Sequence, residues 1–153
     1  MLKSLQEIYA PKGICFGCGC ANDRGLRVQS FVDGGNVVSA WKPEVYHEAF
    51  PGVLNGGIIG TLLDCHSNWA AAYWMMIKRD DKATPCTVTA DYSIKLLRPT
   101  PSNRKIKLSA KMVECNKDRA TIGAELIVDN KVCATCLGTF VSVGPSHPAY
   151  HRW

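Results

Sequence analysis

Asp64 places a carboxylate in the middle of an apolar run that begins with Asn55-Gly56-Gly57. A buried carboxylate is costly unless it is paired, hydrogen-bonded or used in chemistry. The first amides of a helix have no partners inside the helix, so a Gly-Gly start can bind an anion or an oxyanion. The run therefore offers a candidate base and a candidate anion-binding amide, although backbone hydrogen bonds to the Asp and close packing at the glycines would explain the same residues.

The small and polar residues of this run fall on one stripe if the run is helical. Gly57, Thr61, Asp64 and Asn68 recur at helical spacing, and large apolar residues occupy the remaining surface. A face exposed to solvent would be wider and would carry Lys or Glu. The stripe therefore indicates a crevice or an interface with a partner subunit.

The two candidate chemical groups are too far apart to act together within one chain. Eight residues separate Gly56 from Asp64, which corresponds to about 12 Å along a helix axis. If both groups act in one reaction, they come from two copies of the helix packed antiparallel in a dimer.

The elements that would position these residues are one helix and several strands. The pattern predicts a helix over residues 57–77, because the run is long and apolar and ends in Lys78-Arg79. Alternating or β-branched segments separated by turn residues predict strands over residues 26–32, 37–41, 86–99, 104–115, 120–129 and 131–143. We therefore expect an α+β architecture in which about five or six antiparallel strands wrap one nearly central helix.

Length and composition indicate one globular domain. The chain has 153 residues, 46% hydrophobic and 20% charged, which excludes a disordered chain. We expect a lead-in with a cysteine cluster over residues 1–23 and a single domain over 24–153. The start resembles no secretory signal, so we expect reduced thiols and a cytoplasmic protein. No run is long and apolar enough for a membrane span.

The formal charge of +5 favours an anionic partner. The basic residues are scattered and are not interleaved with aromatic ones, which is not typical of a nucleic-acid surface. A small polyanion such as a nucleotide or a coenzyme A phosphate fits this distribution, and we expect no nucleic-acid partner.

Four sequence motifs resemble those of one known family. The central one is H-x-x-x-x-G-x-L-N-G-G-x-x-x-T-L-L-D, over residues 47–64. A C-x-x-C-G cluster and a G-L-R-V segment precede it, and T-A-D-Y-S-I-x-x-L-x-P follows it. Together these motifs, spread from about Cys15 to Val143, resemble the PaaI-type hot-dog thioesterases.

The resemblance implies a hot-dog fold and hydrolysis of an acyl-CoA. It implies a homodimer or a dimer of dimers with active sites at the subunit interface, and no cofactor other than the coenzyme A of the substrate. By position, the Gly56 amide would polarise the thioester carbonyl, and Asp64 of the partner subunit would act as a general base on water or as a nucleophile. Thr89 would supply the hydroxyl that orients the water.

The sequence departs from the family pattern at two positions. Asn55 stands where the family often has His, and Ala49 stands where many members have Asn. Asn55 can hold the loop or hydrogen-bond the thioester, but it does not titrate near neutral pH. A non-catalytic acyl-CoA binding or sensing protein on the same fold is therefore the alternative function.

Further residues are weaker candidates. We expect contacts to the substrate from His47, Gly57, Thr61, Asn68, Arg98, Lys117 and Arg119. His66 would lie about 200° around the helix from Asp64, which favours a structural role. Cys15, Cys18 and Cys20 resemble half of a zinc site, but the other cysteine pair, Cys133 and Cys136, would point to opposite faces of a strand. We therefore expect no metal.

Overall fold

A single long helix, α2 (Gly56–Arg79), runs along the molecule. The computed structural model describes residues 1–150; the last three residues of the expected domain, 151–153, lie outside it. Asn55 caps the helix start, and Asp80 ends it in the left-handed conformation with φ of 57°. The helix predicted over residues 57–77 is confirmed. Within residues 1–150, no helix is long and apolar enough to cross a membrane.

Six antiparallel strands form the main sheet, which confirms the predicted α+β class. They are β1 (Phe31–Asp33), β2 (Asn36–Trp41), β5 (Thr87–Leu96), β6 (Ile106–Cys115), β7 (Arg119–Val128) and β8 (Lys131–Ser142). Their order across the sheet is β1-β2-β6-β7-β8-β5, so β5 is an edge strand. The turn between β7 and β8 is formed by Asp129 and Asn130, both with positive φ, as tight hairpins require.

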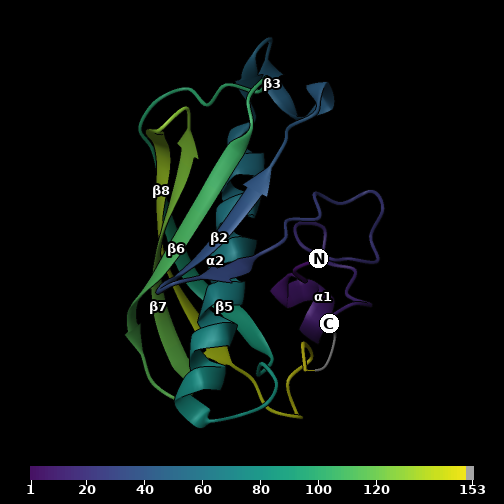
Figure 1. The fold of residues 1–153 in the computed structure, drawn as a ribbon, viewed down its shortest axis with the longest axis vertical. Coiled ribbons are helices and arrows are strands. Elements are labelled where there is room, and N and C mark those ends of the chain that lie inside the picture. Colours follow the sequence, from purple (N-terminus) through teal and green to yellow (C-terminus); the bar gives the residue numbers. More distant parts are fainter. Residues whose placement is uncertain (151–153) are drawn as a thin grey trace.

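Helix α2 is covered on two sides. Figure 1 shows the sheet along one side of α2 and the N-terminal segment with α1 (Leu5–Tyr9) on the other. Leu62, Leu63 and Met75 of the helix are fully buried with Phe140 of the sheet. Burial of one such side chain contributes about 1.5–3 kcal/mol. This packing holds the helix in place along its length.

The strand predicted over residues 26–32 is wrong for most of that range, because β1 covers Phe31–Asp33 alone. The segment before β1 pairs with the N-terminal segment instead, and the Val28 amide donates to the Gly17 carbonyl over 2.9 Å. Val28 is fully buried. The alternating apolar residues of this segment are therefore buried against the N-terminal segment and not as part of the main sheet.

Three short elements precede α2 and were not predicted. They are the 3-10 turn η1 (Val45–His47) and the strands β3 (Glu48–Phe50) and β4 (Val53–Leu54), which pair with each other. Gly52 turns the chain between these two strands with φ of 80°. This small hairpin brings the chain to the start of α2.

Candidate active site

Asp64 and Thr89 meet where the middle of α2 lies beside the start of β5. The Thr89 hydroxyl Oγ1 donates a hydrogen bond to Asp64 Oδ1 over 2.7 Å. The pairing of β5 with β8 shifts in register between Thr89 and Asp91. Such bulges redirect side chains out of the regular alternation. The two residues predicted to act together are therefore in direct contact.

The Asp64 carboxylate is half-buried, and this burial raises its pKa above the ordinary value. The hydrogen bond from Thr89 opposes the rise, and the nearby Cys15 adds to it. A carboxylate with a raised pKa is a stronger base than an exposed one. The surroundings of Asp64 thus suit proton transfer better than those of a surface Asp.

A cavity of about 240 Å³ opens beside Asp64. It lies between α2, the start of β5 and the N-terminal segment, and it is lined by Ala10, Gly13, Ile14, Cys15, Cys18, Gly19, Asp64, Cys65, Asn68, Trp69, Val88 and Thr89. The oxygen Oδ1 of Asn68 is buried and has no hydrogen-bond partner among the described residues. Asp64 and Asn68 of the polar stripe therefore border a crevice, which is one of the two surroundings expected for the stripe.

The start of α2 leaves one amide available. The Asn55 side-chain oxygen accepts from the amides of Gly57 (2.8 Å) and Ile58 (3.2 Å). The Gly56 amide has no acceptor among residues 1–150. Asn55 thus holds the helix start, and the Gly56 amide can still donate to a ligand.

A second cavity, of about 410 Å³, lies at this helix start. Gly56 and Arg98 both line it, together with Ala49 and Leu96. Asp64 and Gly56 therefore border different cavities, as their separation of about 12 Å on one helix requires. One chain thus holds two candidate half-sites.

The two other polar members of the stripe, Thr61 and Asn68, have different surroundings. Thr61 Oγ1 donates to the Gly57 carbonyl over 3.0 Å, so its hydroxyl is already used within the helix. Gly57 is exposed at the helix start. Asn68, in contrast, borders the cavity that contains Asp64. Asn68 is therefore better placed than Thr61 to contact a ligand beside Asp64.

The basic candidates do not gather at one place. Arg98 lies near the start of α2. Lys117 lies at the other end, where its carbonyl accepts from Arg79 Nε over 2.6 Å, and Arg119 follows two residues later. A helix of 24 residues spans about 36 Å. Arg98 is thus the one basic candidate at either half-site.

The two histidines discussed above both have structural partners. His47 Nδ1 accepts from the Glu44 amide over 2.9 Å, and its ring packs against Trp41. His66 is fully buried, and its ring nitrogens lie 2.9 Å from Ser30 Oγ and 3.0 Å from the Val37 carbonyl. Burial lowers the pKa of His66 to about 4, so the ring is neutral. The structural role expected for His66 is confirmed.

The sequence reasoning missed the contribution of the N-terminal segment. Residues of its loop, among them Gly13, Ile14 and Cys15, form one wall of the Asp64 cavity. Gly17 packs so closely on α2 that a Cβ there would lie 2.8 Å from Thr61 Cγ2. The glycines of the C-x-x-C-G cluster were the available signal, since glycine permits close backbone approach.

Comparison with known proteins supports the fold. No protein-family model and no curated protein matches the sequence. A thioesterase superfamily protein from Shewanella loihica is 25% identical, with a TM-score of 0.67 over 82% of this chain and 98% of that one. The PaaI protein from the phenylacetic acid degradation operon of E. coli is 18% identical, with a TM-score of 0.66 over 82% of this chain and 84% of its own.

A third similar structure is a Streptococcus mutans protein bound to acetyl CoA. It is 17% identical, with a TM-score of 0.62 over 76% of this chain and 89% of its own. Several of the structural neighbours are named as PaaI or thioesterase superfamily proteins, and the resemblance found in the sequence is confirmed. The chain has the hot-dog fold.

Proposed function

We propose that this protein is an acyl-CoA thioesterase that works as a dimer of the hot-dog fold. The hydrogen bond between Thr89 and Asp64 at the wall of a cavity carries this proposal. A non-catalytic ligand site needs no carboxylate held by a hydroxyl in a half-buried position. The acetyl CoA held by the Streptococcus mutans neighbour supports a coenzyme A thioester as the ligand.

In this mechanism the two half-sites come from different subunits. The free Gly56 amide of one subunit donates to the thioester carbonyl and stabilises the oxyanion that forms on it. Asp64 of the other subunit takes a proton from water, and the water oxygen adds to the carbonyl carbon. The carbon–sulfur bond then breaks, the proton passes to the leaving sulfur, and the products are a free acid and coenzyme A.

Thr89 and the residues around the two cavities position the reactants. The Thr89 hydroxyl holds one oxygen of Asp64, which leaves the other oxygen for the water. Asn68 contributes a buried carbonyl oxygen with no described partner beside the same cavity. Arg98 lies at the half-site of Gly56 and is the candidate for the phosphates of coenzyme A.

The proposal is tested by free-thiol release from a panel of acyl-CoAs, with Asp64→Asn compared with the wild type. We expect the rate of thiol release to fall by about 10²-fold or more, which is the loss expected when a general base is removed. Binding of the same thioesters should be retained. Asp33→Asn is the matched control, because Asp33 is exposed at the end of β1 and lines neither the Asp64 cavity nor the Gly56 cavity. Its rate should equal that of the wild type.

Two results would contradict this function. If the wild type binds acyl-CoA and releases no thiol, the protein is an acyl-CoA binding protein, which the uncharged Asn55 and Ala49 would suit. If thiol release is equal in the wild type and Asp64→Asn, Asp64 is a structural carboxylate.

A further inference from the structure

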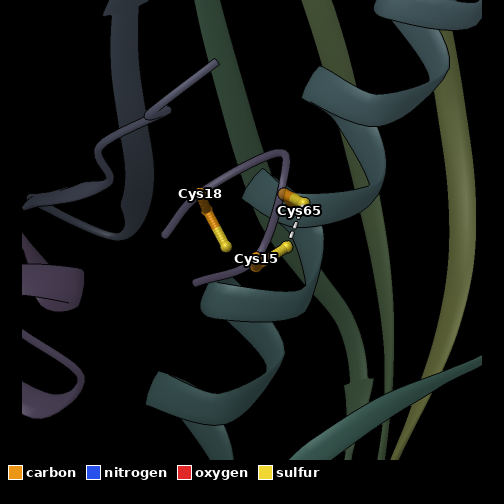
Figure 2. Close-up of side chains that lie close together, drawn as sticks. All are labelled: Cys15, Cys18 and Cys65. Atoms are coloured by element: carbon orange, nitrogen blue, oxygen red, sulfur yellow. Dashed lines mark hydrogen bonds between the residues drawn. The ribbon is translucent and has the colours of Figure 1, made fainter. Parts of the chain in front are cut away.

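Three thiols from two distant parts of the chain meet beside the Asp64 cavity (Figure 2). Cys15 and Cys18 come from the N-terminal loop, and Cys65 comes from α2. Their sulfur atoms all lie within 4.8 Å of one another, with 3.8 Å between Cys15 Sγ and Cys65 Sγ. The sequence grouped Cys20 with the first two cysteines, whereas the structure supplies Cys65 as the third thiol.

The spacing of these sulfurs fits a metal ion. Zinc–sulfur bonds of about 2.3 Å at tetrahedral angles place two sulfurs about 3.8 Å apart. Clustered thiolates are soft ligands and select zinc over magnesium or calcium. We propose that Cys15, Cys18 and Cys65 bind one zinc ion that ties the N-terminal loop to helix α2.

One of the three sulfurs already has a hydrogen-bond donor. Trp69 Nε1 of α2 donates to Cys18 Sγ over 3.3 Å. Such N–H to sulfur bonds stabilise thiolates and fix the direction of ligands around a metal. Cys18 therefore has a partner of the kind seen around bound metals.

The N-terminal loop also packs closely on helix α2 beside the three thiols. A Cβ on Gly17 would overlap Cys65 Sγ, so only glycine lets the loop backbone come this close. The Gly17 carbonyl accepts from the Val28 amide, which holds the loop from its other side. The two elements that carry the ligands are thus fixed relative to each other.

The fourth position of the zinc ion opens toward the cavity. All three cysteines line the cavity that contains Asp64 and Thr89. Within residues 1–150, the group holds no fourth His, Cys, Asp or Glu. Three protein ligands with one open position are typical of zinc sites that also bind water. This proposal replaces the expectation from the sequence that no metal is bound, and it does not depend on the hydrolysis proposed above.

Zinc content and affinity of the full chain test this site. The protein is purified without chelator, its zinc is measured by mass spectrometry, and the reduced metal-free protein is titrated with zinc against a competing chelator. We expect one zinc per chain. Affinity should fall by at least about 100-fold in Cys65→Ser and in Cys15→Ser, consistent with the loss of one of three ligands.

Cys20→Ser is the matched control, since Cys20 lies in the same loop but outside the group. Its zinc affinity should stay within about twofold of the wild type. Two ligand variants are used because Cys65 is buried and its substitution can disturb folding, whereas Cys15 is exposed. Cys15→Ser therefore tests the site even where Cys65→Ser fails to fold. Circular dichroism confirms that each variant is folded.

Three outcomes would overturn the zinc site. The first is less than about one zinc in ten chains together with no zinc uptake by the reduced protein. The second is equal loss of affinity in Cys20→Ser and Cys65→Ser. The third is zinc uptake by the reduced protein with the same affinity in the wild type, Cys15→Ser and Cys65→Ser.

Discussion

Thr89 fixes one oxygen of Asp64, and this contact is the most specific feature of the proposed site. The hydroxyl donates over 2.7 Å to a carboxylate that is half-buried. A hydrogen bond to a charged group contributes about 1.5–3 kcal/mol, more than one between neutral groups. In the proposed mechanism Thr89 therefore acts through Asp64 as a positioning residue.

Replacing Thr89 with Val should slow thiol release with little change in affinity for the thioester. The Val side chain keeps the shape but loses the donor, so Asp64 is free to turn away from the water. We expect kcat to fall by about 10- to 100-fold, which corresponds to the free energy of the lost hydrogen bond. KM should change less. Steady-state kinetics of each variant measure both constants.

Thr89→Ser is the rescue variant, because it restores the hydroxyl without the methyl group. Its kcat should return to within a few-fold of the wild type. Equal losses in Thr89→Val and Thr89→Ser would instead indicate that the methyl packing of Thr89 matters, and the positioning role would be wrong.

At the scale of elements, α2 and β5 lie side by side. The position of α2 along β5 brings Asp64 and Thr89 together. A Cβ on Gly56 would lie 3.6 Å from Leu96, and one on Gly60 would lie 3.6 Å from Ile94. Thr89 contacts Asp64 further along the same pair of elements. The start of α2 therefore determines where Asp64 lies along β5.

Asn55→Ala should destabilise the protein through the start of α2. The Asn55 side chain accepts from two helix amides, and the loss of such a cap costs about 1 kcal/mol. Urea unfolding of the two proteins measures the free energy of unfolding. Asn55→Asp keeps an acceptor and adds a negative charge at the helix start, so it should unfold like the wild type or later. If Asn55→Ala and Asn55→Asp unfold alike, the cap does not contribute.

The wrong prediction of a strand over residues 26–32 also has a physical explanation. Residues 26–30 alternate like a strand, and Val28 is fully buried as a strand residue would be. Arg27, however, has φ of 53°, which interrupts an extended strand. The alternation of apolar residues predicted that residues 26–30 are buried. It did not predict that the N-terminal segment covers them.

At the scale of the whole molecule, the proposed mechanism requires a second chain. β5 is an edge strand, and edge strands present unpaired backbone groups that pair with another chain. Tyr92 and Leu96 on this strand are 48% and 59% exposed, and Gly56 and Gly57 at the adjacent helix start are exposed too. This exposed edge with the adjacent helix start is the proposed dimer interface.

Sedimentation equilibrium should give a mass of at least a dimer for the wild type. Leu96→Glu adds a charge to the proposed interface, so its dimer should dissociate at least about tenfold more readily and its thiol release should fall in parallel. Val113→Glu is the matched control, because Val113 is 62% exposed on β6, a strand in the middle of the sheet. A wild type that is monomeric at working concentration and active would contradict shared active sites.

Local features were readable from the sequence by itself. The helix, five of the six main strands, the turn at Asp129-Asn130 and the polar stripe that carries Asp64 all follow from periodicity and turn chemistry, which act between residues close in the chain. A role for Thr89 beside Asp64, that of orienting the water, was expected because the motifs around both residues resemble one family, but their direct hydrogen bond was not predicted.

Only the tertiary structure decided the contacts between distant segments. It placed Cys65 beside Cys15 across 50 positions of sequence, and it separated Arg98 from Lys117 at opposite ends of α2. It also gave the N-terminal segment a place in the wall of the Asp64 cavity. The physical reason is that such contacts depend on how the whole chain packs around its core, and no local pattern of residue types encodes that arrangement.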